Sequence, residues 1–181
     1  GLCASAAKVQ RGDLFFCYKG RSFDSHEVAA RAVRGGAAAL VCERKLDLPG
    51  PQLIVGDGRA AMTAAAREFY GRPDRRLKMV GVTGTNGKTT VTYMLDSIFR
   101  AAGRSTGVIG TLGIAFAGRA IAPELTTPDP ICLFSVLREM ADCGVEYVFM
   151  EVSAHALGFG KTEGITFEAG IFTNCTQDHL D

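Results

Sequence analysis

The stretch from Met79 to Thr90 constrains the fold of this chain most, because an apolar strand runs there into a glycine-rich loop and then into a lysine and two threonines. Gly84 and Gly87 let the backbone adopt positive φ and approach a ligand without a Cβ clash. The free N–H groups at the start of the following helix attract an anion. We therefore interpret the stretch as a phosphate-binding loop; an incidental glycine-rich turn is the alternative.

The side chains of this loop suit a nucleotide and its metal ion. Lys88 carries a positive charge that reaches the outer phosphates, and the hydroxyl of Thr89 or Thr90 is a hard oxygen ligand for Mg²⁺. The common pattern G-x-x-x-x-G-K-[ST] has glycine where this chain has Val82, so the match is incomplete. The predicted nucleotide-binding residues of the loop are Gly84, Thr85, Asn86, Gly87, Lys88, Thr89 and Thr90.

Composition excludes several other classes of function. A formal net charge of +1 over 181 residues gives no electrostatic case for nucleic acid or for an anionic membrane surface. No apolar run approaches the roughly 20 residues that span a bilayer, and the N-terminus has no signal pattern. The six cysteines form no C-x-x-C pair, which is typical of buried thiols in a reducing compartment. We expect a cytoplasmic protein; its oligomeric state is open, with a monomer favoured.

The chain is predicted to hold two α/β segments joined by a polar stretch with helix breakers. In the first, Ser25 is expected to cap a helix that stops at Gly35, and a later helix carries Met62 and Phe69. The strands predicted for this segment are residues 13–17, 37–42 and 53–55. The predicted domains are residues 1–72 and 79–181, with a linker over 73–78.

Strands alternate with helices after the loop, which is typical of a doubly wound, mostly parallel sheet. The strands predicted there, besides the one that leads into the loop, are residues 106–109, 112–116 and 147–150. One helix should follow the loop and another should span 130–143. The apolar side expected for the first of these helices is Val91, Met94, Leu95, Ile98, Phe99 and Ala102. The predicted fold class is α/β: a small N-terminal α/β domain, then part of a phosphate-loop ATPase domain.

Polar clusters follow the predicted strands, where ligands bind in such sheets. Glu151 comes directly after a buried strand and is placed to bind Mg²⁺ or to orient its water, although a surface glutamate is the alternative. Thr126-Thr127-Pro128 is a rigid loop of hydroxyls, or simply the start of a helix with Pro at its first position. Residues 173–181 gather oxygen and nitrogen donors, some of which a capped helix start would explain.

Together these motifs resemble the Mur ligase family over nearly the whole chain, in the order that this family shows. The resemblance is greatest to the members that add the third residue of the peptidoglycan stem peptide. The Mur ligase version of the loop does not require glycine at Val82. The motifs are Thr83-Gly84-Thr85-Asn86-Gly87-Lys88-Thr89-Thr90, Thr126-Thr127-Pro128, Glu151-Val152-Ser153-x-His155 and Thr173-Asn174-x-Thr-Gln-Asp-His179-Leu-Asp181.

The resemblance implies a role for each part of the chain. The first domain would bind the uridine diphosphate of UDP-N-acetylmuramoyl-dipeptide, and the second ATP and Mg²⁺. The catalytic residues it implies are Lys88, Glu151 and His179. Those of the metal shell are Thr89, Glu151 and His179. Those around the nucleotide, besides the loop, are Asn174 and Asp178. Those facing the UDP-sugar peptide are His26, Thr126, Thr127, Ser153 and Lys161.

The reaction implied by the resemblance is ATP-driven amide formation in peptidoglycan synthesis. The substrate carboxylate attacks the γ-phosphate to give an acyl phosphate, which the amine of a diamino acid, meso-diaminopimelate or L-lysine, then displaces. Mg²⁺ and Lys88 would offset the charge on the transferring phosphoryl group. A metal-binding carbamylated lysine and the domain that selects the amino acid should lie beyond Asp181. The chain, which lacks an initiator Met, is therefore expected to be a fragment that does not ligate alone.

Departures from the family pattern concentrate on the substrate side. The usual Asp-Ser-Arg is Ser5-Ala6-Ala7 here, the second serine after Glu151 is Ala154, and an expected arginine is Lys161, which loses bidentate recognition. These changes motivate one alternative function, a non-catalytic relative that keeps ATP binding as a scaffold. A folate polyglutamate ligase is another, although its usual Gly-Lys-Gly-Ser differs from the loop found here.

Overall fold

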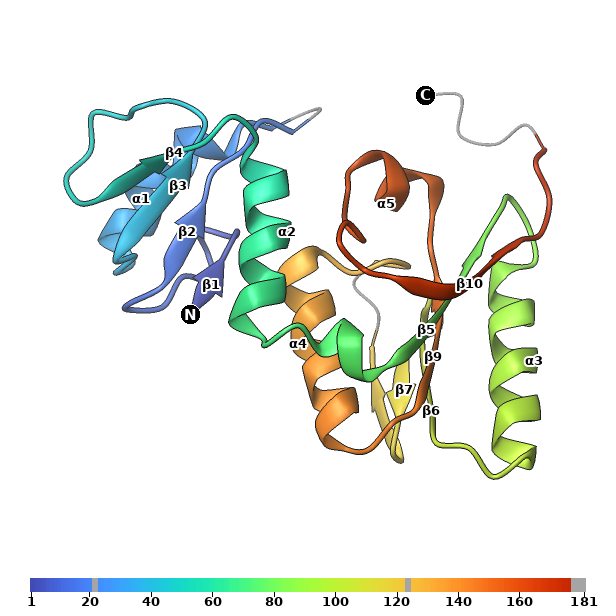
Figure 1. Ribbon diagram of the computed structural model, residues 1–181. Helices are drawn as coiled ribbons and strands as arrows, with labels where there is room; N and C mark the ends of the chain where they lie inside the picture. The colour runs from blue at the N-terminus through green and yellow to red at the C-terminus, as the bar shows by residue number, and fades with distance from the viewer. Residues whose placement is uncertain (21–22, 123–124, 177–181) are drawn as a thin grey trace. The chain divides into compact units, whose positions relative to one another are not determined.

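Figure 1 shows a computed structural model of the chain, which describes residues 1–20, 23–122 and 125–176. The chain divides into two compact units, Gly1–Ala66 and Arg67–Asp181. Each unit holds its own β-sheet. This arrangement confirms the predicted α/β class.

The first unit is built on a four-stranded parallel sheet in the order β1-β2-β3-β4. Its strands are β1 (Leu2–Cys3), β2 (Leu14–Phe16), β3 (Ala39–Cys42) and β4 (Gln52–Ile54). The three predicted strands are confirmed to within two residues. No sequence pattern indicates β1, because two residues are too few to show alternation. The core residues of this unit include Phe15, Cys17, Ala29, Ala32, Leu40 and Cys42.

The helices of the first unit are η1 (Ser25–Val28), α1 (Ala29–Arg34) and α2 (Gly58–Phe69), the last of which crosses into the second unit. The prediction that Ser25 caps the first helix is wrong. Asp24 is the cap, because its carboxylate accepts the His26 backbone N–H at 3.0 Å. The Ser25 hydroxyl instead bonds back to Tyr18, donating to its carbonyl at 2.9 Å and accepting its N–H at 2.7 Å.

The second unit holds a six-stranded sheet in the order β10-β5-β9-β6-β7-β8. The first four strands pair in parallel, whereas β6, β7 and β8 form an antiparallel meander. The sheet is therefore mostly parallel, as predicted. Its strands are β5 (Lys78–Thr83), β6 (Thr106–Gly110), β7 (Gly113–Phe116), β8 (Arg119–Ile121), β9 (Tyr147–Glu151) and β10 (Phe167–Phe172).

Two long helices cover opposite faces of this sheet, with α3 on one side and α4 on the other (Figure 1). The helices of the unit are η2 (Pro73–Arg76), α3 (Lys88–Ala101), α4 (Pro130–Asp142) and α5 (Ala154–Gly158). Pro130 stands at the start of α4 as expected, and the buried residues of this helix include Leu133, Val136, Leu137 and Met140. Across the described part of the chain, no helix has the length and apolar character that a membrane span needs.

The apolar side predicted for α3 is wrong in part. Met94 and Ile98 are about as exposed as surface residues, at 60% and 62%, while Thr92 and Asp96 are buried. The buried Asp96 carboxylate is satisfied by hydrogen bonds: it accepts from the Thr106 hydroxyl of β6 at 2.6 Å and from Arg100 at 3.0 Å. A polar contact between helix and strand thus sets the rotation of α3, which hydrophobic spacing alone does not reveal.

Candidate nucleotide and metal site

The phosphate-binding loop leaves β5 at Thr83 and enters α3 at Lys88. Gly84 has φ of +124° and Gly87 has φ of +84°, both in the region that favours glycine. A Cβ on Gly84 would collide with the Thr173 hydroxyl, so no larger residue fits there. A Cβ on Gly87 would meet no atom within 4 Å, which leaves the loop open on that side.

The start of α3 fits an anion. Gly87 is its N-cap and no side chain caps the helix, so the first-turn N–H groups lack an intrahelical or capping acceptor. The Lys88 ammonium lies over the loop and donates to the carbonyls of Gly84 at 2.7 Å and Thr85 at 2.9 Å. Because an ammonium has three N–H donors, one remains for a phosphate oxygen.

The end of β10 supports the loop from the other side, because β10 pairs with β5. Asn174 lies against Asn86, accepting its N–H at 3.0 Å and donating to its carbonyl at 3.1 Å. The Thr173 hydroxyl donates to the same carbonyl at 2.7 Å. The structure thus brings Asn174 to the loop, whereas Asp178 and His179 lie outside the described residues.

Glu151 is the buried acid of the site, with 1% of its surface exposed. Its Oε2 accepts the Thr89 hydroxyl at 3.0 Å. Thr111 holds it on the other side, donating its backbone N–H to Oε1 at 2.9 Å and its hydroxyl to Oε2 at 3.0 Å. Sequence reasoning missed Thr111. The signal that could have found it is its place directly after β6, at the carboxyl edge of the sheet.

Gly110 makes room for this carboxylate. A Cβ at Gly110 would overlap with Oε1 of Glu151, so β6 can end beside the acid only if that position is glycine. The pairing of β6 with β9 brings Gly110 beside Glu151, since the preceding residues Ile109 and Met150 are partners. The carboxylate is therefore held by the ends of three elements, β6, β9 and α3.

The pair formed by Thr89 and Glu151 fits Mg²⁺, which prefers hard oxygen ligands and keeps several waters and substrate phosphates in its shell. Within the described ranges, no group of three His, Cys, Asp or Glu side chains gathers that could hold a metal alone. A metal at this place would thus bind to one or two protein oxygens and to the nucleotide. That donor set suits Mg²⁺ better than zinc, which takes nitrogen and sulfur ligands.

The loop Thr126-Thr127-Pro128, called the hydroxyl loop from here on, lies beside Glu151. The Thr127 hydroxyl donates to the backbone carbonyl of Glu151 at 2.9 Å and accepts the Ser153 N–H at 3.1 Å. The hydroxyls of Thr126 and Thr111 are 3.2 Å apart. The Ser153 side chain caps α5 by accepting the Ala156 N–H at 3.2 Å. The structure therefore brings Thr126, Thr127 and Ser153 together near Glu151, whose side chain contacts Thr89.

Lys161 binds to the hydroxyl loop and to the residue that follows it. Its ammonium donates to the Thr127 carbonyl at 3.3 Å and forms an ion pair with Asp129 at 2.8 Å. Only 14% of the Lys161 side chain is exposed, so the pair is partly shielded from solvent. Lys161, where the family resemblance predicts an arginine, is thus engaged with protein groups, and a third N–H remains for a ligand.

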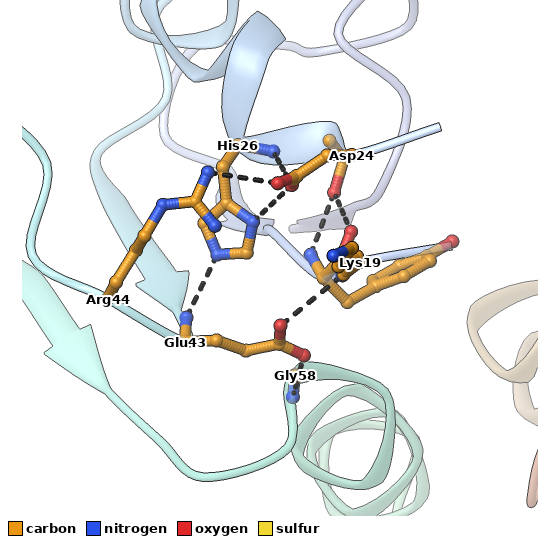
Figure 2. A network of polar contacts seen from close by, with 8 residues as sticks. Lys19, Asp24, His26, Glu43, Arg44 and Gly58 are labelled. Carbon is orange, nitrogen blue, oxygen red and sulfur yellow. Dashed lines mark hydrogen bonds and ion pairs between the residues drawn. The ribbon is translucent and has the colours of Figure 1, made fainter. Parts of the chain in front are cut away.

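His26 belongs to a separate network in the first unit, shown in Figure 2. The imidazole is buried; Nε2 accepts the Glu43 backbone N–H at 3.0 Å, and Nδ1 pairs with the Asp24 carboxylate. This pattern requires the neutral tautomer with its proton on Nδ1. The Glu43 side chain in turn accepts the Gly58 N–H at the start of α2, at 3.0 Å.

The electrostatics of this network centre on Asp24. The hydrogen bond from the His26 ring holds the pKa of the Asp24 carboxyl well below its usual range, helped by the His26 backbone N–H and by Arg44, whose Nη2 is 2.9 Å from Oδ2. Both nitrogens of His26 are occupied by protein groups. The substrate contact predicted for His26 stays a prediction, and the geometry assigns its side chain to holding the loops around it.

Comparisons with known proteins agree with this geometry. The model of the Mur ligase middle domain matches residues 82–181. The UDP-N-acetylmuramoyl-L-alanyl-D-glutamate--2,6-diaminopimelate ligase of Geobacillus kaustophilus is 48% identical over 174 residues, which make up 96% of this chain and 36% of that protein. The chain thus spans little more than a third of the length of that curated relative.

Solved structures extend the match to the fold. A structure of a UDP-N-acetylmuramoyl-L-alanyl-D-glutamate--2,6-diaminopimelate ligase superposes with a TM-score of 0.86 at 26% identity, covering 100% of this chain and 37% of that one. MurF ligase from Thermotoga maritima, solved in complex with ADP, has a TM-score of 0.57 at 26% identity and covers 84% of this chain and 32% of that one. With a family model that matches most of the second unit and a fold shared with solved ligases, the chain belongs to the Mur ligase family.

Proposed function

We propose that the full-length protein containing this chain is an ATP-dependent ligase that joins diaminopimelate to UDP-N-acetylmuramoyl-L-alanyl-D-glutamate. The relatives that match nearly the whole chain carry this activity in their names. The observation that carries the proposal is the position of Glu151, which touches Thr89 of the phosphate-binding loop through its side chain and Thr127 of the hydroxyl loop through its carbonyl. A nucleotide site and a second polar loop therefore share one buried acid.

ATP and Mg²⁺ are the cofactors that this site fits. The N–H groups at the start of α3 and the Lys88 ammonium would bind phosphate oxygens, and Thr89 and Glu151 would hold the metal or its waters. Asn174 would lie near the nucleotide through its bonds to Asn86. Mg²⁺ would supply charge compensation for the phosphoryl group as it transfers. The predicted roles of Asp178 and His179 remain part of this proposal.

The residues of this chain would promote the reaction mainly by positioning the reactants and by offsetting the charge on the phosphates. Lys88 would bind the phosphate oxygens as their charge redistributes, because its ammonium is already fixed over the loop. Thr126, Thr127 and Ser153 would line the side from which the substrate carboxylate approaches, and Lys161 would hold their loop in place. The carboxylate oxygen bonds to the γ-phosphorus, ADP leaves, and the amine of diaminopimelate then displaces phosphate from the acyl phosphate.

The first unit would contribute the binding site for the uridine diphosphate. We propose the division predicted from the sequence: residues 1–72 for the UDP-substrate, 73–78 as a linker and 79–181 as part of the ATP-binding domain. The location that we propose is the cytoplasm. All six cysteines are free thiols, and burial raises the pKa of Cys17 to about 12, which keeps it inert.

A ligation assay tests this function. The full-length protein is incubated with ATP, Mg²⁺, UDP-N-acetylmuramoyl-L-alanyl-D-glutamate and diaminopimelate, and ADP and the tripeptide product are followed by mass spectrometry. The expected result is stoichiometric ADP and product that need every component, with none from residues 1–181 alone. ATP binding without substrate-stimulated ADP release would instead identify a scaffold, and ADP release that needs a folate would identify a folate polyglutamate ligase.

A further inference from the structure

Thr111 occupies the junction between the phosphate-binding loop and the hydroxyl loop. It follows β6 directly and is exposed, while the acid that it contacts is buried. Its backbone N–H and its hydroxyl both donate to the Glu151 carboxylate, at 2.9 Å and 3.0 Å. Its hydroxyl oxygen also lies 3.2 Å from the hydroxyl oxygen of Thr126. No predicted role from the sequence involves this residue.

The number of protons on these groups fixes the direction of each bond. A carboxylate accepts only, so Thr89 and Thr111 must both donate to Glu151. A hydroxyl has one proton, and that of Thr111 is therefore already used. The contact between Thr111 and Thr126 can form only if Thr126 donates. The lone pairs of Thr89 are then left for a metal, and those of Thr126 are left to accept a proton from a ligand.

We propose that Thr111 is a positioning residue that orients the Glu151 carboxylate toward Thr89 and turns the Thr126 hydroxyl into an acceptor for an N–H or O–H group of the bound substrate. The inference rests on the proposed function, because it deepens the role of the same site. Glu151 then acts on both binding sites. By accepting the Thr89 proton it leaves the lone pairs of Thr89 for the metal, and through Thr111 it leaves those of Thr126 for the substrate. Gly110 leaves the room that the Glu151 carboxylate needs to make these bonds, because a Cβ there would overlap with Oε1.

The metal side of the proposal is tested by nucleotide binding rather than by turnover. Thr111→Val in the full-length protein removes the hydroxyl and keeps the backbone N–H bond and the side-chain shape. The affinity for ATP is measured by calorimetry with Mg²⁺ and again with EDTA. We expect Mg²⁺-ATP to bind roughly tenfold or more weakly, as for other residues that orient a metal ligand, and metal-free ATP to bind within about twofold of the unaltered protein.

Two further variants serve as matched controls. Thr111→Ser keeps the hydroxyl and is expected to restore Mg²⁺-ATP affinity to within about threefold, since the bond to Glu151 remains. Thr166→Val makes the same change at an exposed threonine outside the site and should alter no binding constant. Melting temperatures of all variants are compared without metal. An equal loss of affinity with and without Mg²⁺, or a serine variant as weak as the valine variant, would overturn the positioning role.

The substrate side is tested by a double-mutant cycle on the KM of the UDP-substrate. Thr126→Val should raise this KM, and adding Thr111→Val should raise it no further, because the acceptor that Thr111 orients is already gone. Additive effects would refute the link between the two hydroxyls. Failure of the unaltered protein to bind nucleotide or to ligate would refute the proposed function instead, so the two failures are distinct.

Discussion

The Thr89 hydroxyl donates to Oε2 of Glu151 at 3.0 Å, although the two residues are 62 positions apart in the chain. The parallel pairing of β5 with β9 makes this contact possible, because it sets Val82 opposite Glu151. The acid therefore ends its strand beside the strand that feeds the phosphate-binding loop. A substitution that moves the side chain of Thr89 or Glu151 should therefore weaken metal-dependent nucleotide binding even where the fold is retained.

Removing the Lys88 ammonium should abolish tight nucleotide binding. Lys88→Met keeps the length of the side chain but leaves no charge for the phosphates, so ATP affinity should fall by at least about tenfold, the size of a lost charged hydrogen bond. Calorimetry on the full-length protein measures the change. Lys78→Met, at an exposed lysine at the far end of β5, is the control and should bind ATP normally. Unchanged ATP affinity in the Lys88 variant would contradict the assignment of the loop.

Adding one methyl group at Gly110 should disturb the acid. In Gly110→Ala the new Cβ overlaps with Oε1 of Glu151, so the carboxylate must move away from Thr89. We expect a loss of about 1–3 kcal/mol in unfolding free energy, as for other overpacked sites, together with weaker Mg²⁺-ATP binding. Gly170→Ala in β10 meets no atom within 4 Å and should be close to neutral in both measurements. Equal behaviour of the two variants would show that the space at Gly110 is not needed.

Loosening the hydroxyl loop should affect substrate binding alone. Lys161→Met removes the bonds to Thr127 and Asp129, and we expect the KM for the UDP-substrate to rise about tenfold while ATP affinity stays within about twofold. Lys161→Arg keeps the charge and should retain most of the affinity. Steady-state kinetics with each substrate varied in turn separate the two effects. A parallel loss of ATP affinity would show that Lys161 supports the whole site.

The Asp24 network should make the first unit sensitive to acid. Because the folded-state pKa of Asp24 is lowered, the carboxylate stabilises the fold at pH values above its ordinary pKa of about 3.9 and loses this contribution as the pH falls below it. Asp24→Asn should therefore melt at a lower temperature than the unaltered protein at pH 7, and the gap should shrink below about pH 4. Asp47→Asn, at an exposed carboxylate, provides the comparison. A gap that is constant with pH would argue against the lowered pKa.

Local sequence patterns predicted the parts of the fold that depend on neighbouring residues. The order of apolar strand and glycine loop predicted the helix that follows, which is α3 from Lys88, and Pro130 marked the start of α4. The same patterns failed where a long-range polar contact decides the structure. The buried Asp96 is hydrogen-bonded to Thr106 of the next strand, and the Ser25 hydroxyl bonds to Tyr18 instead of capping the helix.

The candidate site shows the same division. Lys88, Thr89 and Glu151 could be named because each ends or follows a recognisable element. Thr111 was missed although it directly follows β6, because a lone threonine after a strand is common and the register of β6 against β9 is what brings it to the acid. The engagement of Lys161 with Asp129 is likewise a contact across two loops, which no spacing in the sequence encodes.

The central claim, that this protein activates a carboxylate through an acyl phosphate, is tested most directly by oxygen transfer. The full-length protein is given UDP-N-acetylmuramoyl-L-alanyl-D-glutamate with ¹⁸O in the reacting carboxylate, together with Mg²⁺-ATP and diaminopimelate, and the released phosphate is analysed by mass spectrometry. Because the carboxylate oxygen stays with phosphorus when the amine displaces phosphate, we predict one ¹⁸O atom in each phosphate formed with product. Product formation with unlabelled phosphate, or with the label in AMP, would contradict the account.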